Sequence, residues 1–433
     1  MSVDTKPKIR LNSWLLPVLV LAAVITDLLV PYRGWRVLYV GLGGALLVGY
    51  WWARSLARGL DLTREMRFGW AQVGDRLVER FTLRNDGWAP GVWIEVDDQS
   101  TLPDYRASRG TGLPGRDSLR WHTEAICNRR GLFVLGPTYL RTGDPFGLYT
   151  VSLSYPAALP LLVLPPIVPL PNIQIAPGGR SGDGRPRTDA IDRTVSAASV
   201  REYIPGDSRR WIHWRTTARR DALYVRLFDG TPAGDWWILL DMDVDVQAGE
   251  KENATDEHGI VLAASLADQG IRLRHSVGLV AYGEELVWLP PEQGEGRRWE
   301  ILRSLALISR GSHPLAEVMT RLQSSLGQHT SIVIITPAVT TSWVESLVPL
   351  IRRGAVPTVL LLDPASFGGA GDTLLVEAAL LHLGIAHYRI TRDVLDRPEM
   401  RPGQQGQWGW RVLGTGRAVP TYRVADVPWR SLT

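Results

Sequence analysis

Trp236-Trp-Ile-Leu-Leu-Asp-Met-Asp-Val-Asp245 joins an unbroken apolar run to three aspartates at alternate positions. Consecutive apolar residues without alternation are typical of a strand that is buried on both faces, as in a parallel sheet covered by helices. Aspartates directly after such a strand lie at the carboxyl edge of the sheet, where open α/β sheets bind their ligands. The stretch therefore predicts an α/β domain with an acidic loop at its ligand-binding edge.

The residues after this strand alternate between helical and strand periodicity. Such alternation predicts a doubly wound α/β domain with helices on both faces of a mainly parallel sheet. A hairpin around Gly283-Glu284 is expected between two of the strands. The predicted helices are 255–269, 298–308, 315–325, 342–353 and 373–383, and the predicted strands are 275–282, 285–289, 331–336, 357–362 and 386–390.

Two apolar runs near the N-terminus predict a membrane anchor. They occupy about 14–30 and 37–53 and are separated only by Pro31-Tyr-Arg-Gly-Trp-Arg36. Runs of this length are long enough to span a bilayer as helices, and so short a connection predicts an antiparallel transmembrane hairpin. Basic residues precede the first run and follow the second, which places both ends in the cytoplasm.

The segment between the hairpin and the α/β part has short runs that alternate at period two. Two of them, 76–83 and 91–96, have Asn85-Asp-Gly87 as the turn between them. Glycine and proline punctuate the remaining runs, as is usual in all-β domains. We expect a small antiparallel β-sandwich. The other predicted strands are 119–125, 131–135 and 150–154.

The chain is too long for one ordinary core, so several domains are expected. A stretch rich in Pro, Gly, Arg and Ser precedes the second half and is typical of a linker. The predicted parts are a membrane anchor at 1–61, a β-sandwich at 62–165, a linker at 166–200, a signature segment with the α/β domain at 201–395, and a C-terminal tail at 396–433.

Composition excludes several functional classes. The net charge of +4 over 433 residues does not indicate nucleic-acid binding. The single cysteine, Cys127, excludes an internal disulfide, and no His-Glu-x-x-His or Cys-His cluster predicts a zinc site. No Gly-x-Ser-x-Gly or phosphate-binding loop is present. We therefore expect neither an enzyme nor a small-molecule substrate.

The acidic loop holds Asp241, Asp243 and Asp245. Three carboxylates so close together cannot all stay ionised cheaply without a cation or an arginine nearby. Ligand sets made of oxygen favour Mg²⁺, Mn²⁺ or Ca²⁺. Two interpretations stay open: a divalent-metal site, or an acidic loop that is solvated or paired with nearby arginines.

A second dense stretch precedes the α/β domain: Arg201-Glu-Tyr-Ile-Pro-Gly-Asp-Ser-Arg-Arg-Trp-Ile-His-Trp-Arg-Thr-Thr-Ala-Arg219. Its Pro-Gly pair predicts a turn, and Asp207 is a candidate N-cap for a short helix that carries two tryptophans on one face. Its arginines are placed to pair with carboxylates, so the segment is either a docking surface or a clamp between two domains. The candidate residues are Arg201, Glu202, Tyr203, Pro205, Gly206, Asp207, Arg210, His213, Trp214, Arg215 and Arg219.

The α/β part resembles a von Willebrand factor A-type domain. That fold holds a metal ion with an Asp-x-Ser-x-Ser loop, a threonine from a second loop and an aspartate from a third. Asp241 matches the first aspartate, Asp243 and Asp245 replace the serines, and Ser312 stands for the threonine. Pro337 takes the place of the third acid. The resemblance implies an altered metal site, with Mg²⁺ or Ca²⁺ as its candidate ions.

Nearly the whole chain resembles bacterial domain-of-unknown-function family 58. The signature from Arg201 to Arg219 carries the resemblance, together with Arg130-Gly131, Gly136-Pro137 and Asp144-Pro-Phe-Gly-Leu148. It implies an adaptor in the bacterial cytoplasmic (inner) membrane, whose partners are a MoxR-type AAA+ ATPase, other membrane or envelope proteins and the lipid bilayer. The implied role is assembly or maturation of envelope or metal-containing complexes. The alternative is a divalent-metal-dependent hydrolase that uses the acidic loop.

Overall fold

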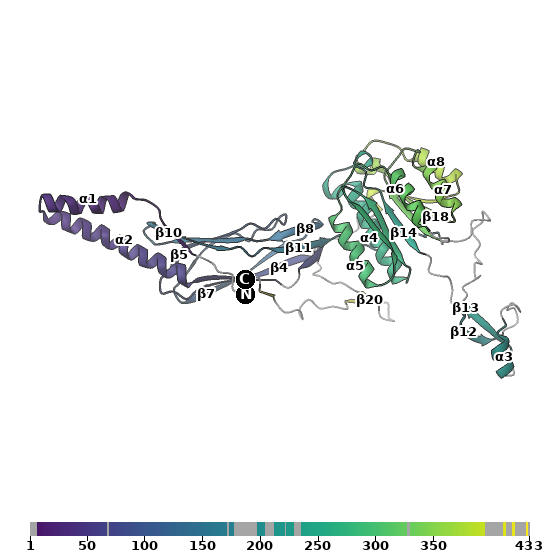
Figure 1. Cartoon of the computed structure of the whole chain (residues 1–433), viewed down its shortest axis with the longest axis horizontal. Coiled ribbons are helices and arrows are strands. Elements are labelled where there is room, and N and C mark those ends of the chain that lie inside the picture. Colours follow the sequence, from purple (N-terminus) through teal and green to yellow (C-terminus); the bar gives the residue numbers. More distant parts are fainter. Residues whose placement is uncertain are drawn as a thin grey trace. The chain divides into compact units, whose positions relative to one another are not determined.

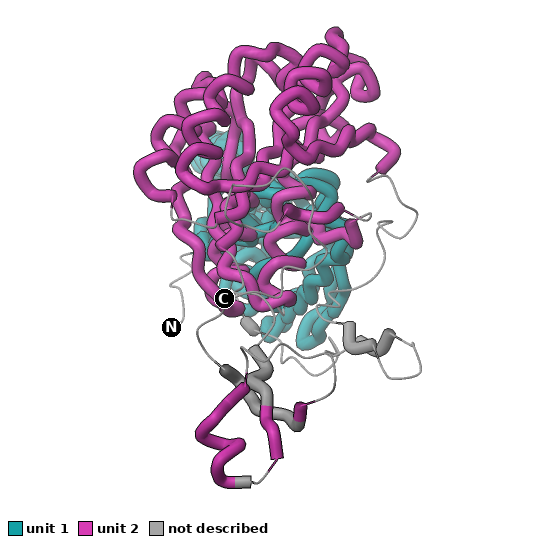
Figure 2. Tube along the Cα trace, turned by 90° about the vertical axis from the view of Figure 1, so that its right-hand side faces the viewer, with its two compact units in different colours: residues 1–165, 399–433 teal, residues 166–398 magenta. Residues whose placement is uncertain are grey.

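The computed structural model of the chain describes residues 7–66, 69–170, 173–176, 197–203, 212–220, 222–228, 235–326, 330–394, 410–412, 418–420 and 430–431. The chain divides into two compact units, which Figure 1 labels by element and Figure 2 by colour. The first comprises Met1–Pro165 with Glu399–Thr433, and the second comprises Pro166–Pro398. Each unit contains its own hydrophobic core.

The first unit begins with a helical hairpin of α1 (Leu15–Leu29) and α2 (Arg33–Gly59), drawn in purple in Figure 1. Asp27 secures the turn between them, because its carboxylate accepts hydrogen bonds from Tyr32 N at 3.2 Å and from Arg36 Nε at 3.3 Å. No helix among the residues that the structure describes is both long and apolar enough to cross a membrane.

α2 is longer than the apolar run that predicts it. It continues past Ala53 to Gly59 because its last two turns are buried in the core of the following β-domain. Ala53, Leu56 and Ala57 all belong to that core. The hairpin and the β-domain are therefore packed into one body through a continuous helix.

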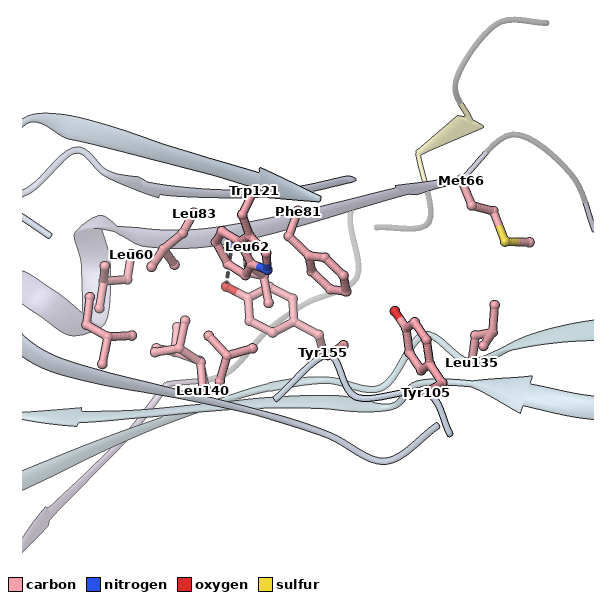
Figure 3. Close-up of a cluster of buried hydrophobic side chains, with 14 of the residues drawn as sticks. Leu60, Leu62, Met66, Phe81, Leu83, Tyr105, Trp121, Leu135, Leu140 and Tyr155 are labelled. Carbon is pink, nitrogen blue, oxygen red and sulfur yellow. Dashed lines mark hydrogen bonds between the residues drawn. The ribbon is translucent and has the colours of Figure 1, made fainter. Parts of the chain in front are cut away.

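The β-domain is the predicted antiparallel β-sandwich. Its sheets have the strand orders β1-β10-β9-β5-β6, β22-β2-β4-β7 and β3-β11-β8, and all pairings are antiparallel except β3 with β11. Figure 3 shows the core side chains between the layers. The strands are β1 (Lys8–Leu11), β2 (Leu60–Met66), β3 (Trp70–Gln72), β4 (Arg76–Asn85), β5 (Gly91–Asp98), β6 (Arg109–Leu113), β7 (Asp117–Ile126), β8 (Gly131–Leu135), β9 (Thr138–Gly143), β10 (Tyr149–Tyr155), β11 (Leu159–Leu164) and β22 (Arg430–Ser431).

Two features of this unit differ from the sequence interpretation. The turn at Asn85-Asp-Gly87 joins strands of different sheets, since β4 pairs with β2 and β7 whereas β5 pairs with β6 and β9. Asn85 Nδ2 instead donates to the carbonyl oxygens of Ala89 and Pro114, which holds the turn against another loop. The C-terminal residues contribute strands: β22 pairs with β2, and β20 (Trp410–Val412) pairs with β21 (Ala418–Pro420).

The second unit is the predicted doubly wound α/β domain. Its sheet has the order β16-β15-β14-β17-β18-β19, and only β16 is antiparallel to its neighbour. The elements are β14 (Trp236–Leu240), α4 (Thr255–Arg272), β15 (Val277–Tyr282), β16 (Leu286–Glu292), α5 (Glu295–Leu307), α6 (Leu315–Leu322), β17 (Ser331–Thr336), α7 (Leu347–Arg352), β18 (Val356–Leu362), α8 (Leu374–His382) and β19 (Ala386–Ile390).

Alternate residues of each central strand face opposite layers of helices. Trp237 and Leu239 of β14 belong to a core cluster that also includes residues of α6, α7 and α8. Leu240 faces the other side, where α4 approaches so closely that a Cβ on Gly259 would lie 3.0 Å from Leu240 Cδ1. Burial on both faces is why these strands are apolar at every position.

Part of the predicted linker is attached to this domain. Val168 N donates to Ser265 Oγ at 2.9 Å, and Ala176 N donates to Thr358 Oγ1 at 3.1 Å. Ser331 Oγ in turn donates to Ala176 O at 2.8 Å. The end of the stretch forms β12 (Ala197–Glu202), which begins before the signature itself.

Candidate functional site

The acidic loop leaves the carboxyl end of β14, as its sequence predicts. Asp241 is buried, with 3% of its surface exposed, and Asp243 is also buried, whereas Asp245 is exposed. Asp243 N donates to Asp241 Oδ1 at 3.1 Å, and Asp245 N donates to Asp243 Oδ1 at 3.2 Å. Each of the first two carboxylates therefore holds the backbone of the loop that follows it.

A residue that sequence reasoning missed completes this arrangement. Thr336 is the last residue of β17, and its hydroxyl donates to Asp241 Oδ2 at 2.6 Å. The same hydroxyl accepts a hydrogen bond from Ala338 N at 3.0 Å. The available signal was a polar residue at the end of the apolar strand 331–336. The sequence does not reveal that this strand is the neighbour of β14.

The environment of Asp241 disfavours its charge. Burial is the largest effect and raises the pKa of its carboxyl group to about 6, and the nearby charge of Asp243 acts in the same direction. The hydrogen bonds from Thr336 and from Asp243 N oppose this rise, since they stabilise the carboxylate. A carboxyl group with such a pKa changes its charge near neutral pH.

A second loop runs beside the acidic loop. Val244 N donates to Gly311 O at 2.8 Å, and Gly311 N donates to Met242 O at 2.9 Å. The other side of Gly311 faces the turn at Gly283. A Cβ on Gly311 would lie 2.1 Å from Gly283 O, so the close approach of these two backbones requires glycine at 311. Beside it, Arg310 holds Asp256 through two hydrogen bonds of 2.7 Å. Ser312 follows in this loop and is exposed.

These residues can be tested as a divalent-metal site. Both oxygens of Asp241 already accept protein hydrogen bonds, and Asp245 and Ser312 are exposed. Pro337 offers no ligand after β17. Within the described part of the chain, no three His, Cys, Asp or Glu side chains lie close enough together to hold a metal ion. The arrangement fits a hydrogen-bonded loop better than an open coordination site.

The neighbouring strand ends in a similar way. Asp363 follows β18 and is buried. It accepts hydrogen bonds from Ala365 N at 3.2 Å and from Arg389 of β19 at 2.8 Å. Buried polar side chains therefore stabilise the loops after three adjacent strands, β14, β17 and β18, at the edge where open α/β sheets bind ligands.

The signature segment forms a small substructure of β12, α3 (Trp214–Arg220) and β13 (Tyr224–Phe228). The two strands pair antiparallel, with Arg201 opposite Val225 and Glu202 opposite Tyr224. Tyr203 N donates to Leu223 O at 2.8 Å and extends the pairing. The segment is thus a β-hairpin whose connection contains the helix.

The start of α3 differs from the sequence prediction. The helix begins at Trp214, and His213 Nδ1 accepts a hydrogen bond from Thr216 N at 3.2 Å, as an N-cap side chain does. Asp207, the predicted N-cap, lies outside the described residues, together with Pro205, Gly206 and Arg210. The expected pairing of the arginines with Glu202 or Asp207 also falls outside what the structure describes.

Three signature side chains of α3 are directed to solvent. Trp214 is 67% exposed, and Arg215 and Arg219 are exposed as well. Ile212, just before the helix, is buried. Within this substructure the helix therefore presents a tryptophan and two guanidinium groups on its surface.

The fold and these sites define a β-sandwich protein with a helical hairpin, joined to a doubly wound α/β domain with a β-hairpin and helix before its first strand. Residues 199–377 match the family "Protein of unknown function DUF58". Over these residues the match confirms the resemblance inferred from the signature.

Two bacterial relatives extend this similarity. "Uncharacterized protein YeaD" of Bacillus subtilis is 25% identical over 285 residues, which cover 64% of this chain and 69% of the relative. "Uncharacterized protein Mb1516" of Mycobacterium bovis is 24% identical over 186 residues, which cover 41% of this chain and 59% of the relative.

Among solved structures, the SpRpn10 VWA domain is similar with a TM-score of 0.28 and 14% sequence identity. The match covers 40% of this chain and 98% of that domain. At this score the similarity supports no inference about function, and the doubly wound class of the second unit rests on its strand order.

Proposed function

We propose that the protein is a membrane-anchored interaction protein whose signature helix α3 docks a partner protein. The exposed Trp214 is the observation that carries this proposal. Tryptophan and arginine are the residues that most often dominate the energetics of protein interfaces. Trp214, Arg215 and Arg219 place both types on one short helix, which favours a docking surface over a buried clamp.

The exposed surface of the hairpin supports the membrane anchor. Many large apolar side chains are exposed along both helices, and a gathering of exposed apolar side chains is a mark of a protein or membrane interaction site. Burial in a bilayer removes this surface from water, and the hairpin topology keeps both ends on the same side. These side chains are Trp14, Leu15, Val18, Leu19, Leu21, Ile25, Leu28, Leu29, Val30, Tyr32, Val37, Leu38, Val40, Leu47 and Val48.

The partner class follows from the family resemblance. A MoxR-type AAA+ ATPase is the proposed partner, and assembly or maturation of envelope or metal-containing complexes is the proposed process. Arginine forms bidentate pairs with carboxylates, so Arg215 and Arg219 suit an acidic patch on that partner. The adaptor would then hold the ATPase at the cytoplasmic membrane, near its membrane-bound clients.

The test is capture of a purified MoxR-type ATPase by the full chain in detergent, with and without ATP. Trp214→Ala and Arg215→Ala are each expected to weaken capture roughly 10-fold or more, as truncation of an interface hot spot does. Arg303→Ala is the matched control, since Arg303 is an exposed arginine of α5. Capture that is unchanged in both signature variants would contradict the proposal.

A further inference from the structure

Two loops of the sandwich contact the part of α2 that enters this domain. The first loop contains Asp144-Pro-Phe-Gly-Leu148, and it lies so close to α2 that a Cβ on Gly49 would be 3.2 Å from Asp144 Oδ2. Asp144 is buried and accepts a hydrogen bond from Phe146 N at 3.0 Å. Asn12 Nδ2 donates to Gly147 O at 2.8 Å and holds the loop from its other side.

This construction leaves Phe146 outside. The loop is tightly held by Asp144 and Asn12, yet the phenylalanine at its tip is 57% exposed. Because these hydrogen bonds fix the backbone of the loop, the loop geometry itself places the Phe146 side chain in an exposed position. The position of this loop beside α2, at Gly49, is therefore a property of the fold.

The second loop lies on α2 one to two turns further along. Trp52 Nε1 donates to Pro90 O at 3.0 Å, and Ala89 N donates to Ser55 Oγ at 3.3 Å. The Trp88 ring meets the Trp52 ring edge to face at 5.5 Å between centroids, yet Trp88 remains 55% exposed.

Two more exposed aromatic residues belong to the same region. Trp51 lies on α2 itself and is 59% exposed. Trp93 is 39% exposed, and it lies beside the strand that leads into the first loop, since a Cβ on Gly143 would be 3.2 Å from its ring. We call Trp51, Trp88, Trp93 and Phe146 the aromatic collar.

The two loops contact only a short part of α2. Their contacts span Gly49 to Ser55, which is about 9 Å at 1.5 Å per residue. The headgroup region on one side of a bilayer is about 5–8 Å thick. From Arg33 to Trp51 the helix extends about 27 Å, close to the ~30 Å of a hydrocarbon core.

We propose that the aromatic collar inserts into the headgroup region of the bilayer that holds the hairpin and seats the sandwich on the membrane surface. The proposal rests on the membrane anchor described above. Amphipathic aromatic rings are enriched at this level of membrane proteins. Arg54 and Arg58 follow Trp51 on the same helix, where guanidinium groups reach lipid phosphates. The helical hairpin and the sandwich would then form one support with a defined height above the membrane.

The experiment measures the membrane depth of fluorophores on single cysteines in the full chain, reconstituted in vesicles of phosphatidylcholine and phosphatidylglycerol. Cys127 is completely buried, so introduced surface cysteines can be labelled selectively. Pro145→Cys reports on the collar and leaves its four aromatic residues in place. Leu21→Cys on α1 reports on the hairpin. Leu132→Cys on β8 is the matched control, because Leu132 is an apolar residue of the sandwich that is 57% exposed, as is Phe146.

Lipids with a quencher at the headgroup are expected to quench the label at position 145 several-fold more than the label at position 132. Figure 1 draws β8 at the end of the first unit that is remote from α1. Acyl-chain quenchers are expected to act at position 21. Equal quenching at 145 and 132 with strong quenching at 21 would overturn the collar and leave the anchor standing. No quenching at 21 would overturn the anchor itself.

A second variant separates insertion from mere proximity. Trp88→Ser combined with Phe146→Ser, in the Pro145→Cys background, removes half of the collar. Headgroup quenching at position 145 is expected to fall toward the level of position 132, whereas quenching at position 21 should persist. Unchanged quenching at 145 in this variant would show that the aromatic residues do not hold the sandwich on the membrane.

Discussion

Thr336 Oγ1 lies 2.6 Å from Asp241 Oδ2 and donates a hydrogen bond that joins the ends of β17 and β14. Both residues are buried, so the hydroxyl is one of the few groups that compensate the carboxylate for lost water. The pair links two loops at the edge of the sheet where ligands of α/β domains bind. Its strength should therefore control both the stability and the charge state of this edge.

The raised pKa of Asp241 predicts a specific pH dependence. The folded pKa of about 6 exceeds the ordinary value of 3.8, so the folded state binds the proton more tightly than the unfolded state. The stabilising effect of the protonated form is complete below the unfolded pKa and is lost as pH rises from about 4 through 6. The side chain of Asp241→Asn cannot ionise, so this variant does not lose the stability. Its free energy of unfolding at neutral pH is expected to exceed that of the natural chain by up to ~3 kcal/mol. The difference in unfolding temperature between variant and natural chain should grow in favour of the variant from pH 4 to pH 7; a constant difference would contradict the prediction.

Removal of the Thr336 hydroxyl should destabilise the same edge. Thr336→Val leaves Asp241 without one of its two donors, which costs about 1–3 kcal/mol at neutral pH. Because that hydrogen bond lowers the pKa of Asp241, the pKa should also rise further. Thr340→Val, at an exposed position of the loop after β17, should change the free energy of unfolding by less than about 0.5 kcal/mol. Chemical unfolding of the three proteins checks this, and equal effects of the two substitutions would refute it.

The buried ion pair of the sandwich predicts a large effect of Arg64. Its guanidinium bonds Glu79 at 2.7 and 2.9 Å and Asp98 at 2.8 Å, and all three side chains are buried. Arg64→Ala leaves two buried carboxylates without their cation, so a loss of about 3–5 kcal/mol is expected. Arg76→Ala breaks the solvent-exposed pair with Glu124 and should cost less than about 1 kcal/mol. Thermal unfolding distinguishes the two, and similar losses would contradict the assignment.

The junction between α2 and the sandwich depends on glycine. A Cβ on Gly59 would lie 2.3 Å from Gly87 N, a backbone atom that cannot move aside without shifting its loop. Gly59→Ala is expected to cost about 1–3 kcal/mol, as overpacking does. Gly110→Ala serves as the control, because nothing lies within 4 Å of its added Cβ. The free energy of unfolding of both variants is measured by chemical denaturation. Equal values for Gly59→Ala and Gly110→Ala would argue against this close approach.

The acidic loop should be insensitive to divalent cations. A ligand that binds only the folded state raises its stability with concentration, by about 2.7 kcal/mol at one hundred times the dissociation constant. Millimolar Mg²⁺ or Ca²⁺ is expected to leave the unfolding temperature unchanged, since protein donors already engage both oxygens of Asp241. A rise that disappears in Asp241→Asn but persists in Asp372→Asn, which changes an exposed acid of the same domain, would instead support a metal site.

Periodicity predicted the α/β domain well because its strands are buried on both faces. The predicted bounds of β14, β17 and β19 coincide with the observed ones. The helices between them were placed within about three residues, except that α7 begins only at Leu347, after a 3-10 turn, instead of at 342. Alternation was similarly informative in β4, where buried residues recur at every second position. In both cases the spacing of the apolar residues within a segment indicates which of its faces are buried.

Long-range pairing was beyond the reach of such patterns. Nothing local distinguishes a turn that closes a hairpin from one that passes between sheets, so the partners of β4 and β5 could not be read from Asn85-Asp-Gly87. The extension of α2 past Ala53 depends on a core that distant strands supply. The N-cap role of His213 likewise depends on where α3 begins.

By itself, the sequence determined the α/β class of the second unit, the family signature and the position of the acidic loop after β14, because apolar spacing and residue type are local properties. Only the tertiary structure brought Thr336 onto Asp241, Gly311 onto the backbone of the acidic loop, and Asp144 beside α2. Contacts between residues distant in the chain arise from how strands are ordered and how helices pack. That order is decided by the whole core, which no single stretch of the chain encodes.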